Sequence, residues 1–176
     1  MTVAAERVPS ALDEPLTTGY DVLQFGYDEA FELFATLPAP SPEEMNGEYR
    51  GEMLDQGSRL WTLAVLLAVN LPGRWIAKGF APTEGDEGAG YNAFVRGSQI
   101  VRGVRMRTYV GPSTLDGRAS YHLDYSAYNW GLVGTFHDEI RKLTGDLYLG
   151  IGYVGWGPLH RRTAFLMQGP MAPLER

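Results

Sequence analysis

The chain has 176 residues, of which 44% are hydrophobic and 20% charged, a composition typical of an ordinary globular protein. A net charge of −6 and a pI near 5.0 exclude the broad basic surface that nucleic-acid binding requires, so we expect no nucleic-acid partner. The chain has no cysteine, which excludes disulfides and thiolate chemistry. The start of the chain lacks the apolar run of a signal peptide, and the longest apolar stretch, 60–69, is too short to cross a membrane, so we expect a cytoplasmic protein.

The first part of the chain shows no periodicity. Residues 1–20 contain Pro9 and Pro15 among small polar residues, a pattern that predicts a flexible arm. The rest of the chain, residues 21–176, has the length of one domain, and we expect a single one.

Two helices are predicted early in the chain. From Tyr27 to Leu37 apolar residues recur at helical spacing until Pro38, which predicts a helix whose single apolar stripe covers another surface. The second run, 60–69, is apolar all round and follows Ser58, a suitable N-cap. We expect this helix to be buried on most sides or to plug an opening.

Sharp alternation of apolar and charged residues predicts a strand over 47–54, between the two helices. Beyond residue 74 the pattern is again that of strands separated by short glycine-containing turns, which favour antiparallel neighbours. The predicted strands are 74–80, 90–97, 99–110, 118–126, 131–142, 146–154 and 162–168. About eight antiparallel strands close most economically into a barrel. The alternative is an α+β cone, in which the helices pack inside a strongly curved sheet.

Two segments resemble a known family. The first is Ala30 to Pro38 followed by Gly47-Glu48-Tyr49-Arg50-Gly51, and the second is Arg74 to Phe80, with its Trp and Lys-x-Phe. They are similar to the corresponding segments of bacterial lipocalin-like proteins with a GxWxG motif, although Tyr49 stands in place of the Trp. The resemblance implies a calycin-type barrel with an apolar interior cavity, and it implies no particular activity.

Candidate site residues follow from the alternation along the strands. If Phe136 faces the interior, Asp138 does too, and a carboxylate in an apolar interior is a candidate general acid or base. Tyr121 and Tyr125 on the preceding strand can hydrogen-bond to it or to a ligand carbonyl. The alternative role for Asp138 is structural, as the partner of a buried Arg or Tyr. The residues expected to line a ligand site are Tyr49, Trp75, Met106, Phe136 and Tyr153.

Cofactor and metal sites are not predicted. The chain contains no phosphate-binding or dinucleotide-binding glycine motif. Residues His122, Asp124, His137 and Glu139 are metal-ligating types on adjacent strands. However, they share the face opposite the apolar residues, which we expect to be a solvated surface.

The sequence therefore predicts binding of a hydrophobic small molecule inside the barrel. The alternative is that the same pocket is a cofactor-independent cyclase or isomerase for a polyketide- or terpenoid-like substrate, with Asp138, Tyr125 and Tyr121 as its catalytic residues. A third hypothesis is an interaction module, in which the apolar helix over 60–69 forms a homodimer contact.

Overall fold

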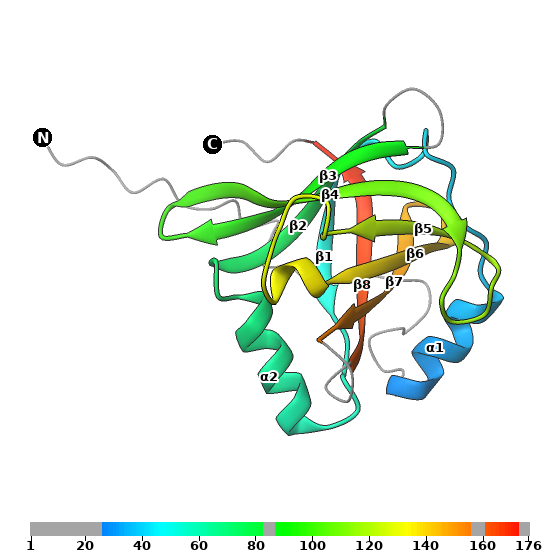
Figure 1. The fold of residues 1–176 in the computed structure, drawn as a ribbon, viewed down its shortest axis with the longest axis horizontal. Helices are drawn as coiled ribbons and strands as arrows, with labels where there is room; N and C mark the ends of the chain where they lie inside the picture. Colours follow the sequence, from blue (N-terminus) through cyan, green and yellow to red (C-terminus); the bar gives the residue numbers. More distant parts are fainter. Residues whose placement is uncertain (1–25, 83–86, 156–160, 173–176) are drawn as a thin grey trace, which may run out of the picture.

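The structure is a computed structural model that describes residues 26–82, 87–155 and 161–172. The arm expected over residues 1–20 lies outside the described residues. Eight antiparallel strands form a closed barrel (Figure 1). They are β1 (Gly47–Met53), β2 (Arg74–Pro82), β3 (Glu87–Arg96), β4 (Gln99–Pro112), β5 (Ala119–Asp124), β6 (His137–Thr144), β7 (Leu147–Val154) and β8 (Arg161–Met171).

Each strand pairs with the next along the chain, and the last strand pairs with the first. The closure runs from Glu48 opposite Met171 to Met53 opposite Phe165. The predicted eight-stranded barrel is thus confirmed. The cone alternative is wrong, because the pairing of β1 with β8 closes the sheet and leaves no open edge.

One predicted strand begins too early. The interval 131–142 was expected to be extended throughout, but β6 starts only at His137. Gly131 has a φ of 61°, which turns the backbone, and residues Val133–Thr135 form a short 3₁₀ helix, η3. The Thr135 hydroxyl donates to the Leu132 carbonyl at 2.6 Å and holds this turn.

Helix α1 (Tyr27–Thr36) packs against the outside of the barrel, as its single apolar stripe predicts. Its buried residues Phe31 and Phe34 form one hydrophobic cluster with Leu149, Ile151 and Leu166 of β7 and β8. The Glu29 carboxylate accepts a hydrogen bond from the Gly26 backbone N–H at 2.7 Å, which satisfies a donor at the helix N-terminus.

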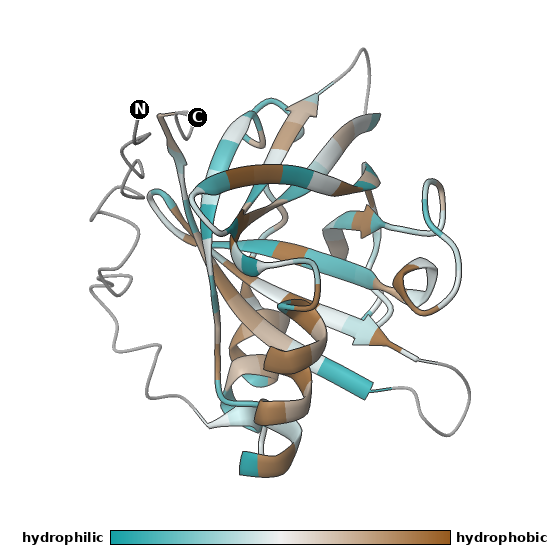
Figure 2. Cartoon of the chain, turned by 90° about the vertical axis from the view of Figure 1, so that its left-hand side faces the viewer, coloured by the Kyte–Doolittle hydropathy of each residue, from teal (hydrophilic) through white to brown (hydrophobic). Residues whose placement is uncertain are grey.

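Helix α2 (Arg59–Val69) lies across one end of the barrel, and its N-terminus is capped by the predicted Ser58, whose hydroxyl accepts from the Trp61 N–H at 3.2 Å. The expectation that α2 is buried on most sides is wrong, because Val65 is its only buried residue. Leu63 and Leu67 are 54% and 63% exposed, and hydrophobic colour runs along much of the helix surface in Figure 2. Within the described residues, no helix has both the length and the apolar character needed to cross a membrane.

The interior of the barrel is only partly filled by side chains. A packed cluster of buried residues fills much of it, including Tyr49, Phe80, Met106, Tyr121 and Ile140. Toward the end that α2 covers, the same cluster continues into residues such as Trp75 and Phe136, which are only partly buried. This unfilled end is where a ligand could be held.

Candidate functional site

A cavity of about 360 Å³ lies between α2 and the barrel interior. This volume falls within the range of small-molecule sites in proteins. Its walls are mostly apolar and come from α2, the η3 turn and the inward faces of the strands. The side chains that form these walls include Val65, Trp75, Phe94, Val104, Phe136 and Phe165.

A polar network of four buried side chains forms one part of the cavity wall. Its centre is the Lys78 ammonium group, which reaches Asp138 Oδ2 at 2.8 Å, the Tyr125 hydroxyl at 2.5 Å and Asn92 Oδ1 at 3.1 Å. An ammonium group has three protons to donate, so these three acceptors satisfy it. The Tyr125 hydroxyl in turn donates to Asp138 Oδ2 at 2.9 Å.

Aromatic rings surround the buried ammonium group. Lys78 Nζ lies between 5.1 and 5.4 Å from the ring centroids of Trp75, Tyr125 and Phe165, within the range of cation–π attraction. The indole N–H of Trp75 also donates to Asn92 Oδ1 at 3.1 Å. The rings therefore stabilise the positive charge of Lys78 in addition to its contact with Asp138.

The environment of Tyr125 fixes its protonation state. Burial, and then the adjacent negative charge of Asp138, raise the pKa of the Tyr125 hydroxyl well above its ordinary value. Tyr125 is therefore a hydrogen-bond donor at neutral pH, and it is not a base.

Irregular backbone helps to shape this end of the barrel. The register of β3 and β4 shifts between Gly90 and Asn92, and opposite this shift Val104 has a φ of 53°. Positive φ is unusual for a β-branched residue, and bulges of this kind redirect side chains. Val104 lies in the bulge on β4 and Asn92 lies beside the shift on β3, and both contribute to the cavity wall.

Glycines in β7 make room for the network. A Cβ atom on Gly152 would lie 2.7 Å from Asp138 Oδ1 and 2.4 Å from the Thr163 hydroxyl. A Cβ atom on Gly150 would lie 2.2 Å from the Phe165 ring. These two glycines therefore provide the space that the Asp138 carboxylate and the Phe165 ring occupy.

The structure brings together five of the eight residues predicted for the site. These are Asp138, Tyr125, Trp75, Phe136 and Tyr153, all of which line the cavity. The inward orientation expected for Asp138 together with Phe136 is thus observed.

The other three predicted residues, Tyr121, Tyr49 and Met106, do not line the cavity and lie in the packed cluster. The Tyr121 hydroxyl donates to Thr108 at 2.8 Å, away from Asp138. The Tyr49 hydroxyl donates to the Glu44 carbonyl at 2.5 Å, and its ring packs on Phe80. These side chains fill the barrel interior, and the hydroxyls of Tyr49 and Tyr121 bond outside the polar network.

Lys78 and Asn92 were not predicted as site residues, although Lys78 carries three of the contacts that define the network. One signal was available in the sequence: Lys78 is a lone charge within the apolar strand segment Ile76 to Phe80. A charge at such a position needs a partner inside the protein.

The polar residues on the outward face of β5 and β6 are not a solvated surface, contrary to the expectation. His122 and Glu139 are 3% and 0% exposed. Thr114, in the connection between β4 and β5, covers this face and donates from its backbone N–H and its hydroxyl to Glu139 Oε1.

No protein-family model matches the chain, and no curated protein matches it. The crystal structure of a protein from Thermomonospora curvata is similar in fold, with a TM-score of 0.54 and 18% sequence identity over 82% of this chain and 87% of that one. At this identity the similarity concerns the fold alone. It is consistent with the lipocalin-like barrel that the sequence resemblance implies, and the comparisons give no support for the GxWxG motif itself.

Proposed function

We propose that this protein binds an uncharged, mainly apolar small molecule in the cavity and orients one polar group of that molecule toward Asp138 and Tyr125. The observation that carries the proposal is the convergence of apolar walls on one compact polar network. This is the usual anatomy of small-molecule sites, in which a few polar groups fix the orientation of a ligand held by apolar contacts.

The preference for an uncharged ligand follows from the charges already present. Lys78 and Asp138 lie 2.8 Å apart and neutralise one another, with side chains only 5% and 12% exposed. A ligand carboxylate at this position would be buried beside the Asp138 carboxylate, which is costly in an apolar environment. A hydroxyl or carbonyl group adds a hydrogen bond to the network without adding a charge.

Competition between matched ligands tests this proposal. The protein is loaded with Nile red, an uncharged dye whose fluorescence increases in apolar surroundings, and is titrated with 1-decanol and with decanoate. We expect decanol to displace the dye at a concentration at least tenfold lower than decanoate. Failure of the dye to bind, or stronger displacement by decanoate, contradicts the proposal.

One substitution should reverse the charge preference. Asp138→Asn removes the internal anion and leaves the Lys78 cation available, so decanoate should then compete at least as well as decanol. The matched control is Asp124→Asn on β5, because Asp124 accepts from Ser126 and pairs with Arg107 and does not line the cavity. The control should keep the decanol preference, and circular dichroism should show that both variants are folded.

Catalysis in the same cavity is the second candidate function. The observation that favours it is the 2.9 Å contact between the Tyr125 hydroxyl and the Asp138 carboxylate inside an apolar cavity. Such a pair could polarise a substrate carbonyl and accept a proton, as a cyclase or isomerase requires. Turnover of a polyketide- or terpenoid-like compound that is lost in Asp138→Asn, while dye binding is retained, would support catalysis. Retained turnover in that variant would exclude Asp138 as the base.

A further inference from the structure

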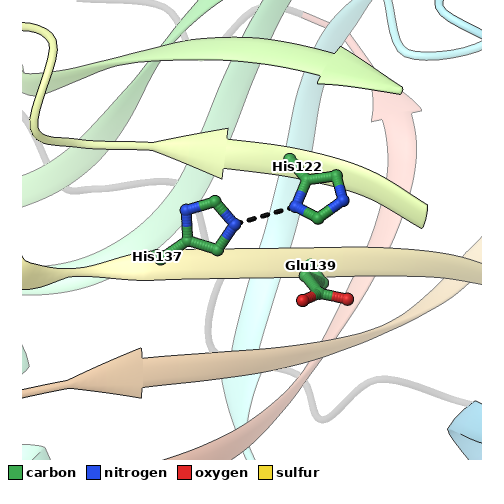
Figure 3. Close-up of side chains that lie close together, drawn as sticks. All are labelled: His122, His137 and Glu139. Carbon is green, nitrogen blue, oxygen red and sulfur yellow. Dashed lines mark hydrogen bonds between the residues drawn. The ribbon is translucent and has the colours of Figure 1, made fainter. Parts of the chain in front are cut away.

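Three metal-ligating side chains meet on the outward face of the barrel, away from the cavity. His122 lies on β5, and His137 and Glu139 lie two residues apart on β6, so all three project from the same side of the sheet (Figure 3). His122 Nδ1 and His137 Nε2 are 2.8 Å apart, and one ligand atom from each of the three residues lies within 4.8 Å of the others.

The cluster is enclosed on one side and reachable on the other. The Tyr109 ring stacks on the His122 ring with a centroid distance of 4.9 Å, and Thr114 covers Glu139. His137 is only half-buried, so an ion from solvent can approach through its side.

The charge of Glu139 is not balanced by a neighbouring cation. Its carboxylate makes no ion pair within the described residues, and its Oε2 atom has no hydrogen-bond partner there. The arginines on the neighbouring strand positions are engaged elsewhere, Arg141 with Asp116 and Arg107 with Asp124. Buried carboxylates are normally paired with a cation or coordinate a metal, so this site lacks a positive charge.

We propose that His122, His137 and Glu139 bind a divalent first-row transition metal ion, and Zn²⁺ is the first candidate. Two imidazoles and one carboxylate are a standard zinc ligand set, with a fourth position left for water. Thr114 holds Oε1 of Glu139 with two hydrogen bonds, and Oε2 has no hydrogen-bond partner within the described residues, so it is available to an ion. Such outer hydrogen bonds orient metal ligands. Tetrahedral coordination requires the two ring nitrogens to separate to ~3.3 Å, a small side-chain adjustment.

Asp124, the fourth residue of metal-ligating type on this face of the two strands, accepts from the Ser126 backbone and hydroxyl and does not belong to the cluster.

Cobalt titration of the full chain tests the site. The protein is stripped with a chelator and titrated with Co²⁺, whose visible absorption intensifies in tetrahedral or five-coordinate sites, and Zn²⁺ is then added. We expect one equivalent of Co²⁺ to bind, Zn²⁺ to abolish the absorption, and Zn²⁺ to raise the Tm of the stripped protein. No absorption band and no change in Tm would overturn the proposal.

Two variants assign the ligands, and a third is the control. His137→Ala and Glu139→Gln should each weaken Co²⁺ binding at least tenfold. His137 is half-buried, and glutamine can keep the two hydrogen bonds with Thr114, so both variants are expected to fold. The control is Glu32→Gln, the same type of change at an exposed position of α1 that does not belong to the cluster. Unchanged Co²⁺ binding in His137→Ala, or loss of binding in the control alone, would overturn the assignment.

Discussion

The indole ring of Trp75 lies directly on the backbone of Gly51, where a Cβ atom would be only 2.3 Å from its Cη2 atom. The glycine of the first strand therefore makes room for an aromatic wall of the cavity on the neighbouring strand. The motif Gly47-x-Tyr49-x-Gly51 thus has a steric role that its sequence alone does not reveal.

Gly51→Ala should destabilise the protein by about 1–3 kcal/mol, because the added methyl group forces the Trp75 ring to move in a packed interior. The ring lines the cavity, so its displacement should also lower the affinity for Nile red. Urea unfolding and dye titration measure the two effects. Gly103→Ala is the matched control, because no atom lies within 4 Å of a Cβ at that position. A stable Gly51→Ala variant with normal dye binding would contradict this account.

The strand alternation in the sequence predicts the barrel and the inward face of β6, because β5 and β6 pair without a register shift. It does not predict the partners of Asp138. Trp75 and Lys78 are three residues apart and would face opposite sides of a regular strand, but a register shift between Trp75 and Ala77 allows both to line the cavity. Bulges depend on pairing with a neighbouring strand, so a single strand's pattern does not show them.

The sequence also could not show that the outward cluster of His122, His137 and Glu139 is covered by another part of the chain. Alternation correctly placed His122, His137 and Glu139 on one face, opposite the apolar residues. The covering contact from Thr114 comes from a connection 25 residues before Glu139, and no periodic pattern links the two. The sequence of α2 left two alternatives open, a helix buried on most sides and a helix that presents a homodimer face. Its uniformly apolar sequence does not distinguish a covered side from an open one.

The ion pair between Lys78 and Asp138 should be strongly coupled. Lys78→Met leaves a buried carboxylate without its cation and should cost about 3 kcal/mol of unfolding free energy. Adding Asp138→Asn removes that unpaired charge, so the double variant should be more stable than the sum of the two single effects predicts, by at least about 1 kcal/mol. Urea unfolding of the four proteins gives this coupling energy. Additive single effects would show that the two side chains do not interact in solution.

The Asp116–Arg141 pair should produce an acid-dependent loss of stability. Arg141 is fully buried and donates to both carboxylate oxygens of Asp116 at 2.7 Å, and these hydrogen bonds are the main cause that lowers the pKa of Asp116 from an ordinary 3.8 to about 2. Because the folded-state pKa is the lower one, the stabilisation is fully present above pH 4 and is lost as the pH falls toward 2.

Asp116→Asn tests this dependence. At pH 7 the variant should be less stable by roughly 1–2 kcal/mol, because Arg141 loses its charged partner but keeps its hydrogen bonds to backbone carbonyls, and solvent screens the exposed Asp116 carboxylate. The difference from the unmodified protein should shrink as the pH falls from 4 to 2, where Asp116 becomes protonated in both the folded and the unfolded chain. Unfolding free energies measured at several pH values give the result, and a difference that stays constant over this range would contradict the assigned role.

The two sides of α2 should respond differently to substitution. Leu63 and Leu67 are largely exposed, so Leu63→Gln and Leu67→Gln should each change the unfolding free energy by less than about 0.5 kcal/mol. Val65 is 4% exposed and lines the cavity. Val65→Ala should therefore lower the unfolding free energy by about 2 kcal/mol, because the apolar contacts of the two deleted methyl groups are lost. Urea unfolding compares the three variants, and equal effects on both sides would mean that the outer side of α2 is also covered in solution.

Light scattering on the unmodified chain and on the leucine variants then tests the predicted homodimer contact, since a dimer built on this face must lose its doubled mass when the leucines are replaced.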